Sequence, residues 1–209
     1  MIKLPPLPYA YEALEPTVSA TTMRTHHDKH HAKYVEVTNQ LAAEKGLEGR
    51  SLEEIIAEAG SRGERKLLNN AGQAWNHAFF WTCMTPQRRD PGGELTRLVG
   101  EGFGDLAGLK AKFVEVGANH FASGWVWLVV DDGRLAVVDT HDGDTLANKG
   151  QTPLMVCDLW EHAYYLDYKQ DRKGFLETWF DTVANWEFAE AQLAAAQGRQ
   201  EPWRFDLAA

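Results

Sequence analysis

The sequence predicts an α+β protein, in which an N-terminal antiparallel helical hairpin precedes a C-terminal domain with a small three-stranded antiparallel sheet flanked by helices. Three observations lead to this prediction. Apolar residues recur at helical spacing through two long N-terminal segments. Three short apolar runs with strand-like composition follow, and helical spacing then returns. With 209 residues, the chain can form one large or two small domains with a real core.

The N-terminal third contains the signals of three helices. A segment from about Thr17 to Glu44 keeps helical spacing without an internal breaker and ends before Gly46, which predicts one long helix. A short helix is expected to begin at Ser51, because its hydroxyl can cap the helix while Glu54 reaches back in a capping box. Another long helix is expected over about 64–84. Together they predict the hairpin.

The linker between two domains is expected at residues 88–93 (RRDPGG), which are charged and rich in turn formers. We therefore predict an N-terminal helical-hairpin domain over 1–87 and a C-terminal α+β domain over 94–209. Two or three helices are expected after the linker, up to about Asn119.

The sheet is expected from three apolar runs. Trp125–Val130 and Leu135–Asp139 flank a turn at residues 131–133 and predict a β-hairpin. Leu154–Cys157 is expected to be the third strand. From Glu161 onward the pattern is helical again, as far as Ala196.

Composition excludes several function classes. A net charge of −9 argues against a nucleic-acid or anionic-membrane partner, so an anionic substrate needs locally gathered cations. Only Cys83 and Cys157 are present, in no C-x-x-C pair, which favours a reducing compartment over a disulfide scaffold or zinc ribbon. The start MIKLPPLPY does not resemble a signal peptide, and no apolar stretch reaches membrane-spanning length. A cytoplasmic protein is expected.

Three polar segments could carry chemistry. The first, His26–His31, holds four of the eight histidines, and His26 and His30 lie one helical turn apart on one face. Such a pair can bind iron, zinc or copper, but a solvated polar helix face is an equally ordinary interpretation. The second, Asn69–His77, alternates amides and a histidine with aromatics, and its amides could equally cap or pack locally.

The third segment runs from Asp158 to Tyr165, directly after an apolar strand. Asp158 and His162 can converge on one cation, although an aspartate at a strand end is often a helix cap. Taken together, the three segments supply imidazoles, a carboxylate and a wall of tryptophans, which indicates a buried redox metal in an apolar shell. A zinc hydrolase would carry H-E-x-x-H, which is absent. The tryptophans are Trp75, Trp81, Trp125, Trp127 and Trp160.

Along essentially its whole length the chain resembles the iron/manganese superoxide dismutases. The motifs that carry the resemblance occur in that family's order: Leu7-Pro8-Tyr9, His26-x-x-Lys29-His30-His31-x-x-Tyr34-Val35, Asn69-Asn70, Trp75-Asn76-His77, Gly124-Trp125-x-Trp127-Leu128 and Asp158-x-Trp160-Glu161-His162-Ala163-Tyr164-Tyr165. The resemblance implies conversion of two superoxide anions and two protons to dioxygen and hydrogen peroxide, through a redox-cycling iron site between the two domains.

The resemblance also implies roles for individual residues. The metal ligands are expected to be His26, His77, Asp158 and His162, which removes His30 from the ligand pair that helical spacing alone suggested. His30 is expected in the substrate channel, where it and Tyr34 relay protons, and Gln73 is expected to hydrogen-bond the solvent molecule that completes the site.

A homodimer is implied as well, with a tetramer left open. Glu161 is expected to pair with the partner's His162, and Tyr165 to meet the partner's His30, while Trp125 and Trp160 surround the site. Lys29 and Arg172 could supply local positive charge for superoxide, or be ordinary surface cations.

Iron is the expected metal, one ion per subunit, because iron-type members carry a glutamine at the position of Gln73. Manganese-type members carry glycine there and a glutamine at the position of Gly143. Gly72 replaces the alanine usual in the iron type, and the aspartate after Gly143 resembles the manganese type, so an enzyme active with either metal remains open and manganese is the alternative. His141 is interpreted as a surface loop histidine more readily than as a tuning residue.

Two other functions compete with this interpretation. A mononuclear iron oxygenase would also mix histidine and carboxylate ligands, but the sequence has no motif for a co-substrate pocket. A metal-storing or purely structural dimer with the same fold would have no use for Tyr34, Gln73 and His30, which serve proton and solvent chemistry.

Overall fold

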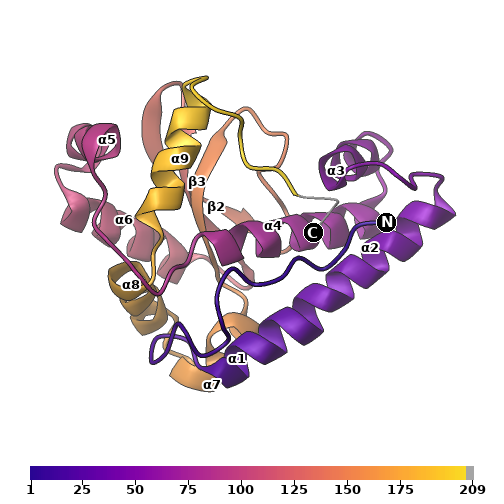
Figure 1. Ribbon diagram of the computed structural model, residues 1–209, viewed down its shortest axis with the longest axis horizontal. Coiled ribbons are helices and arrows are strands. Elements are labelled where there is room, and N and C mark those ends of the chain that lie inside the picture. The colour runs from indigo at the N-terminus through magenta and orange to yellow at the C-terminus, as the bar shows by residue number, and fades with distance from the viewer. Residues whose placement is uncertain (206–209) are drawn as a thin grey trace.

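The computed structural model describes residues 1–205, and its N-terminal part is a helical hairpin (Figure 1). One arm is continuous and consists of α1 (Ala20–Thr25), the π-helical segment η1 (His26–His31) and α2 (Ala32–Glu44). After the short α3 (Leu52–Ser61), the other arm is α4 (Arg65–Thr82), which packs along α2. The predicted hairpin is confirmed.

The first arm differs from the predicted long helix in two respects. It begins at Ala20 and not at Thr17, because the Ser19 hydroxyl accepts the backbone N–H of Thr22 at 3.2 Å and caps the helix there. Its middle, His26–His31, is π-helical, which widens the helix where the histidines lie. A π-helical turn inside an α-helix is common at functional sites, and helical spacing alone does not reveal one.

The start of α3 follows the predicted capping box. The Ser51 hydroxyl accepts the backbone N–H of Glu54 at 3.2 Å, and the Glu54 carboxylate accepts the backbone N–H of Ser51 at 2.8 Å. Two backbone donors at the helix start are thereby satisfied, which fixes where α3 begins.

The C-terminal part is built on an antiparallel sheet with strand order β2-β1-β3. Its strands are β1 (Gly124–Asp131), β2 (Arg134–His141) and β3 (Thr152–Asp158), and each includes its predicted run. Seven of the eight residues of the central strand β1 are buried, because it is paired on both sides and covered by helices. A fully covered central strand explains why β1 is continuously apolar and does not alternate.

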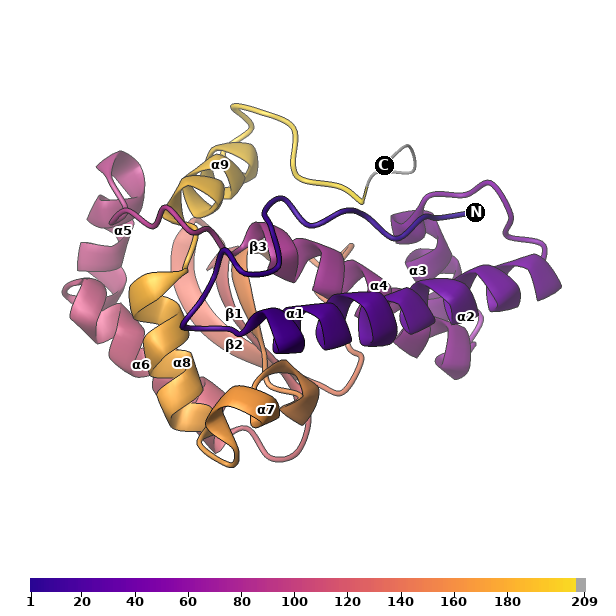
Figure 2. The same cartoon turned by 60° about the horizontal axis from the view of Figure 1, so that its bottom comes forward.

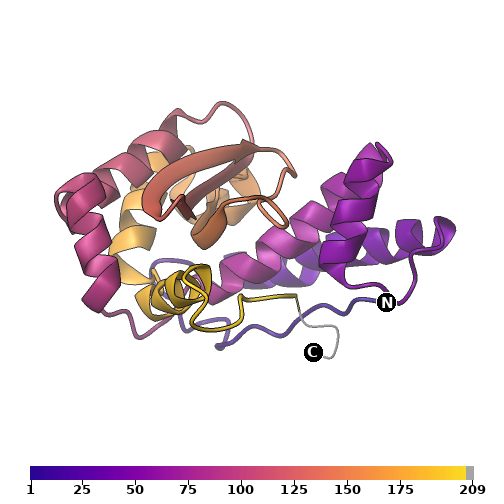
Figure 3. The same ribbon diagram turned by 90° about the horizontal axis from the view of Figure 1, so that it is seen from above.

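Helices cover the sheet on both sides. Before it come α5 (Gly93–Phe103) and α6 (Leu106–Asn119); after it come the 3₁₀ segment η2 (Glu161–Ala163), α7 (Tyr165–Tyr168), α8 (Arg172–Thr182) and α9 (Trp186–Ala196). α6 packs against β1 and β2, whereas α4 and α9 pack against β3. Figure 3 shows α5 and α6 on one side of the sheet and the hairpin on the other. Because α4 reaches β3, the hairpin and the sheet share a boundary.

The chain after α9 turns back and runs toward the hairpin (Figure 2). The Trp203 ring lies 5.3 Å from that of Trp75 and 5.2 Å from that of Phe79, both on α4. The backbone N–H of Phe205 donates to the buried carboxylate of Glu53 on α3 at 2.7 Å. The sequence did not predict this return. The last four residues of the predicted 94–209 domain, 206–209, lie outside the described part of the chain.

Every helix within residues 1–205 falls short of the length and apolar character that crossing a membrane requires.

Candidate metal centre

Four side chains from four separate elements converge where the hairpin meets the sheet. His26, His77, Asp158 and His162 each place one potential ligand atom within 4.8 Å of the other three. Asp158 Oδ2 lies 3.1 Å from His26 Nε2, 3.1 Å from His162 Nε2 and 3.6 Å from His77 Nε2. Three imidazoles and one carboxylate around a single point form a donor set suited to iron or manganese.

Each element brings its ligand candidate to this point for a local reason. His26 begins the π-helical segment, and His77 lies on the face of α4 that is turned toward β3. Asp158 is the last residue of β3, and its Oδ1 accepts the backbone N–H of Trp160 at 2.8 Å, which fixes its second oxygen toward the histidines. His162 follows on the short η2.

The tautomer of His77 is fixed by its own helix. Its Nδ1 lies 2.7 Å from the backbone carbonyl oxygen of Gln73, so Nδ1 carries the proton and donates a hydrogen bond to that oxygen. Nε2 then holds a free lone pair, and it has no hydrogen-bond partner within residues 1–205 although it is fully buried. Within the same residues His26 Nε2 is also buried and forms no hydrogen bond, although it lies 3.1 Å from Asp158 Oδ2. A buried nitrogen without a hydrogen-bond partner destabilises the fold. A metal ion bound by the Nε2 atoms of His26 and His77 removes this cost, so these residues fit a bound metal ion.

Burial and mutual charge keep the ligand candidates in their metal-binding protonation states. Burial lowers the pKa of His26 to about 4, against the opposing effect of Asp158, and it lowers the pKa of His77 well below its ordinary value. Burial alone would raise the pKa of Asp158, but His162 and His26 hold it far below its usual range. Near neutral pH the carboxylate is therefore ionised while His26 and His77 are neutral, as metal binding requires.

Aromatic rings enclose the four side chains. The ring centroid of Trp81 lies 4.7 Å from that of His26, and the centroid of Trp125 lies 4.9 Å from that of His77. Trp160 stacks on His162 at 5.5 Å with an interplanar angle of 15°. Trp81 and Trp125 are fully buried. The predicted apolar shell around the site is present.

Gln73 is buried in this enclosure, and the partly buried Tyr34 lies beside it. Oε1 of Gln73 accepts the indole N–H of Trp125 at 3.0 Å, whereas its buried Nε2 has no hydrogen-bond partner within residues 1–205. The Tyr34 ring centroid lies 5.2 Å from that of His77. Burial raises the pKa of the Tyr34 hydroxyl, which the nearby Gln73 amide partly offsets, so the hydroxyl keeps its proton at neutral pH.

His30 lies beside the cluster at its more open side. Its ring centroid is 4.2 Å from that of His162 and 6.4 Å from that of His26, and the side chain is only half-buried. Burial and the neighbouring His162 lower the pKa of His30. His30 is absent from the set of converging ligand atoms.

The remaining predicted residues lie on the outside. Lys29, Glu161 and Tyr165 are exposed, as is His141, whose Nε2 lies 3.6 Å from Asp142 Oδ2. Arg172 is half-buried. It donates to the Tyr164 hydroxyl at 3.1 Å and to the carbonyl oxygens of His120 and Ala122 at 2.7 and 2.8 Å. Its positive charge is therefore fixed in place by contacts within the chain.

Sequence reasoning missed two supporting groups. His31, one of the clustered histidines, accepts the indole N–H of Trp81 through Nδ1 at 3.0 Å and donates through Nε2 to the carbonyl oxygen of Ala74 at 3.0 Å. The carbonyl oxygen of Asp142 accepts the indole N–H groups of Trp125 and Trp160 at 3.2 and 3.1 Å. The position of His31 in the cluster could have suggested its role, but a backbone carbonyl leaves no sequence signal.

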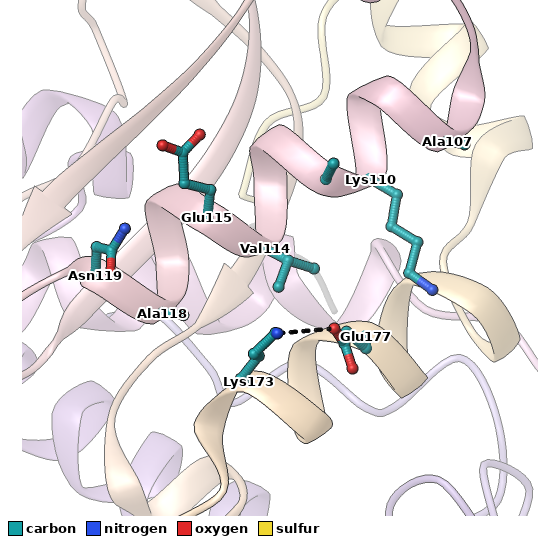
Figure 4. Close-up of a pocket in the computed structure, with 9 residues that line it drawn as sticks. Ala107, Lys110, Val114, Glu115, Ala118, Asn119, Lys173 and Glu177 are labelled. Carbon is teal, nitrogen blue, oxygen red and sulfur yellow. Dashed lines mark ion pairs between the residues drawn. The ribbon is translucent and has the colours of Figure 1, made fainter.

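A separate hollow of about 510 Å³ lies between α6 and α8 (Figure 4). Its lining includes Lys110, Val114 and Glu115 from α6 and the ion pair of Lys173 with Glu177 from α8, at 3.7 Å. None of the four converging side chains lines it, so the hollow is distinct from the metal centre.

Comparisons with known proteins show the family to which this chain is similar. The family description "Iron/manganese superoxide dismutases, alpha-hairpin domain" matches residues 1–85, and "Iron/manganese superoxide dismutases, C-terminal domain" matches residues 91–192. The protein named superoxide dismutase [Fe] of Entamoeba histolytica is 47% identical over 191 residues, covering 91% of this chain and 98% of that protein. Those of a Synechocystis strain and Escherichia coli are 45% and 44% identical over 195 residues, each covering 92% of this chain and 98% of its own.

Proposed function

This chain belongs to the iron/manganese superoxide dismutase family, and from that premise we propose that His26, His77, Asp158 and His162 hold one iron ion that serves superoxide dismutation. In the overall reaction one superoxide anion is oxidised to dioxygen, while a second is reduced and takes up two protons to become hydrogen peroxide. The observation that carries the proposal is the convergence of three imidazole nitrogens and one carboxylate oxygen within 4.8 Å in a buried aromatic enclosure.

An iron ion held by these four residues would supply the electron exchange, by alternating between its trivalent and divalent states. The protein's part is to hold the ligands in place before the metal arrives. The backbone carbonyl of Gln73 fixes the tautomer of His77, and the backbone N–H of Trp160 orients Asp158. The single carboxylate offsets part of the charge of the ion, while neutral imidazoles supply the other lone pairs.

Protons for the peroxide product are proposed to pass through Tyr34 and His30. The Tyr34 hydroxyl stays protonated at neutral pH, and the Tyr34 ring lies beside that of His77. His30 is half-buried and can exchange protons with water while it contacts His162. Gln73 Nε2, a buried donor without a partner within residues 1–205, is proposed to hydrogen-bond a small oxygen ligand in the same space.

Local positive charge is proposed to guide the anionic substrate, because the chain as a whole carries −9 and repels superoxide at long range. Lys29 is exposed one turn from His26, and the charge of Arg172 is held beside Tyr164. The association rate should therefore fall with added salt and with Lys29→Ala; a rate independent of both would contradict guidance.

A homodimer is proposed from an exposed apolar patch, formed by Phe121, Tyr165 and Leu166, which are 90%, 45% and 52% exposed. Arg172 joins the segment of Phe121 to that of Tyr165 and Leu166, because it donates hydrogen bonds to the carbonyl oxygens on both sides of Phe121 and to the hydroxyl of Tyr164. Glu161 is exposed and forms no ion pair within residues 1–205. We propose that it accepts a hydrogen bond from the partner's His162, and that Tyr165 meets the partner's His30.

Two further assignments stay proposals. We propose that residues 1–87 and 94–209 form separate domains, which limited proteolysis within 88–93 would test. We also propose a reducing, cytoplasmic compartment, because Cys83 and Cys157 are buried free thiols. Cell fractionation would test the compartment.

The decisive experiment compares metal-free, iron-loaded and manganese-loaded protein in a superoxide-consumption assay. We expect iron-loaded protein to consume superoxide far faster than metal-free protein. Tight iron binding without superoxide consumption would support a storage or structural role and overturn the proposal. Higher activity with manganese than with iron would keep the reaction but replace the metal.

A further inference from the structure

Helix α4 and the turn that follows β2 approach each other at two glycines. A Cβ atom built on Gly72 would come closer than 3.0 Å to the carbonyl oxygen of Gly143, a separation that real Cβ atoms essentially never show. A Cβ on Gly143 would lie 2.9 Å from the carbonyl oxygen of Asn69 and 3.3 Å from Cγ of Gln73. The turn therefore rests directly on the helix, against the side chain of Gln73.

The turn is also bonded to the walls of the metal centre. The carbonyl oxygen of Asp142 accepts the indole N–H groups of Trp125 and Trp160, at 3.2 and 3.1 Å. The carbonyl oxygen of Asp144 accepts the side-chain amide of Asn76, on α4, at 3.0 Å. A displacement of the turn consequently displaces the one carbonyl oxygen that accepts from two tryptophans enclosing the site.

Gln73 is held between these parts. Its Oε1 shares the indole N–H of Trp125 with the carbonyl oxygen of Asp142, and its Cγ packs against Gly143. The Nε2 donor is buried and has no partner within residues 1–205. The turn therefore borders the Gln73 side chain at Gly143 and, through the Asp142 carbonyl oxygen, shares the indole donor that holds the Gln73 amide.

We propose that Gly72 is a positioning residue that acts through Gln73 and sets the reduction potential of the bound iron. An alanine at position 72 pushes the turn off α4 and gives the Gln73 amide room to withdraw. An N–H donor in the enclosure favours negative charge on an oxygen ligand there, and negative charge favours the trivalent ion. Withdrawal of the Gln73 N–H donor from the enclosure therefore raises the reduction potential of the bound iron. This inference rests on the proposed iron site.

Another helical glycine provides a matched control. A Cβ on Gly60, in α3, would meet nothing within 4 Å. Gly60→Ala and Gly72→Ala make the same chemical change in the same hairpin, and each removes the flexibility of one helical glycine. Only Gly72→Ala places an atom against the turn.

The experiment measures the reduction potential of the iron-loaded wild type, Gly72→Ala, Gly60→Ala, Gln73→Ala and the double variant Gly72→Ala/Gln73→Ala. We expect a higher potential for Gly72→Ala and no change for Gly60→Ala. Once Gln73 is replaced, Gly72→Ala should cause no additional shift, because its effect passes through the missing amide. An unchanged potential in Gly72→Ala overturns the inference, as does a full shift in the Gln73→Ala background.

Should Gly72→Ala fail to fold, Gly143→Ala carries the test, because its Cβ presses on Asn69 and Gln73 from the opposite side. The expected rise in potential is the same, and its absence overturns the inference. Failure of the proposed function is separately visible, as iron-loaded wild type that does not consume superoxide. If the iron-loaded wild type consumes superoxide but Gly72→Ala leaves the reduction potential unchanged, this inference is contradicted and the proposed function is not.

Discussion

The indole N–H of Trp125 donates to Oε1 of Gln73 at 3.0 Å and to the carbonyl oxygen of Asp142 at 3.2 Å. This single shared donor joins the central strand of the sheet, helix α4 and the turn after β2. It fixes which end of the Gln73 amide faces the enclosure, because the oxygen is engaged and the NH₂ group has no hydrogen-bond partner within residues 1–205.

Trp125→Phe keeps the ring in the wall and removes the shared donor. A neutral hydrogen bond is worth about 1 kcal/mol, so we expect turnover to fall about fivefold while the iron content stays unchanged. Steady-state kinetics together with metal analysis would check this. Wild-type kinetics in the variant would show that Gln73 is oriented by other contacts.

His77→Ala and His30→Ala separate a ligand from a channel residue. Loss of the His77 nitrogen should lower the affinity for iron by more than about 100-fold. His30→Ala should retain iron and lose about tenfold or more in turnover, because its proposed task is proton transfer. Iron content after dialysis, followed by activity measured per bound iron, distinguishes the two. Iron loss in His30→Ala with retention in His77→Ala would falsify the assignment.

Acid should destabilise the metal-free protein through His31. Burial, together with the neighbouring His27, lowers its pKa from 6.5 to about 3. Protonation of Nδ1 would place a proton against the indole N–H of Trp81. Below pH 6.5 His31 binds a proton in the unfolded chain but not in the folded chain. The contribution of His31 to the free energy of unfolding is therefore fully present above pH 6.5 and falls as the pH drops toward about 3.

Urea unfolding of the metal-free protein between pH 7 and pH 4 measures this dependence. His31→Gln can keep both hydrogen bonds without titrating, and we expect it to flatten the decline. It should not abolish the decline, because His26, with its pKa lowered to about 4, acts in the same direction. An identical pH profile in His31→Gln would rule out the assigned contribution.

Glu161→Gln tests the proposed dimer contact. Replacing a charged acceptor by a neutral one should raise the dimer dissociation constant about tenfold, equivalent to about 1.4 kcal/mol. Analytical ultracentrifugation over a concentration series would detect the change. Glu115→Gln, an exposed change on α6, is the control and should leave the constant unaltered. A monomeric wild type at micromolar concentration would refute the dimer itself.

Trp203→Ala tests the segment that returns to the hairpin, which lies beyond the family match ending at residue 192. Because Trp203 is half-buried, the free energy of unfolding should fall by about 2 kcal/mol, less than the cost at a fully buried site. Trp203→Phe keeps an aromatic ring against Trp75 and Phe79 and should lose about 1 kcal/mol or less. Equal stability of all three proteins would show that the contact contributes nothing.

The sequence by itself determined most of the elements of the fold, because their signals are local. Helical spacing predicted the two arms of the hairpin, and the Ser51 and Glu54 pair predicted the start of α3. The apolar runs around residues 131–133 predicted β1 and β2, since turn residues between two such runs leave few other conformations. Resemblance to a family then selected the residues of the site.

Only the tertiary structure decided how those residues meet. Local spacing placed His26 and His30 on one helix face, but the approach of Asp158 and His77 selects His26 for the converging cluster. The acceptor role of the Asp142 carbonyl, the contact of Gly72 with Gly143 and the return of Trp203 to α4 join residues far apart in the chain. Such contacts depend on how packed elements approach one another, and no period or spacing within a single element encodes that approach.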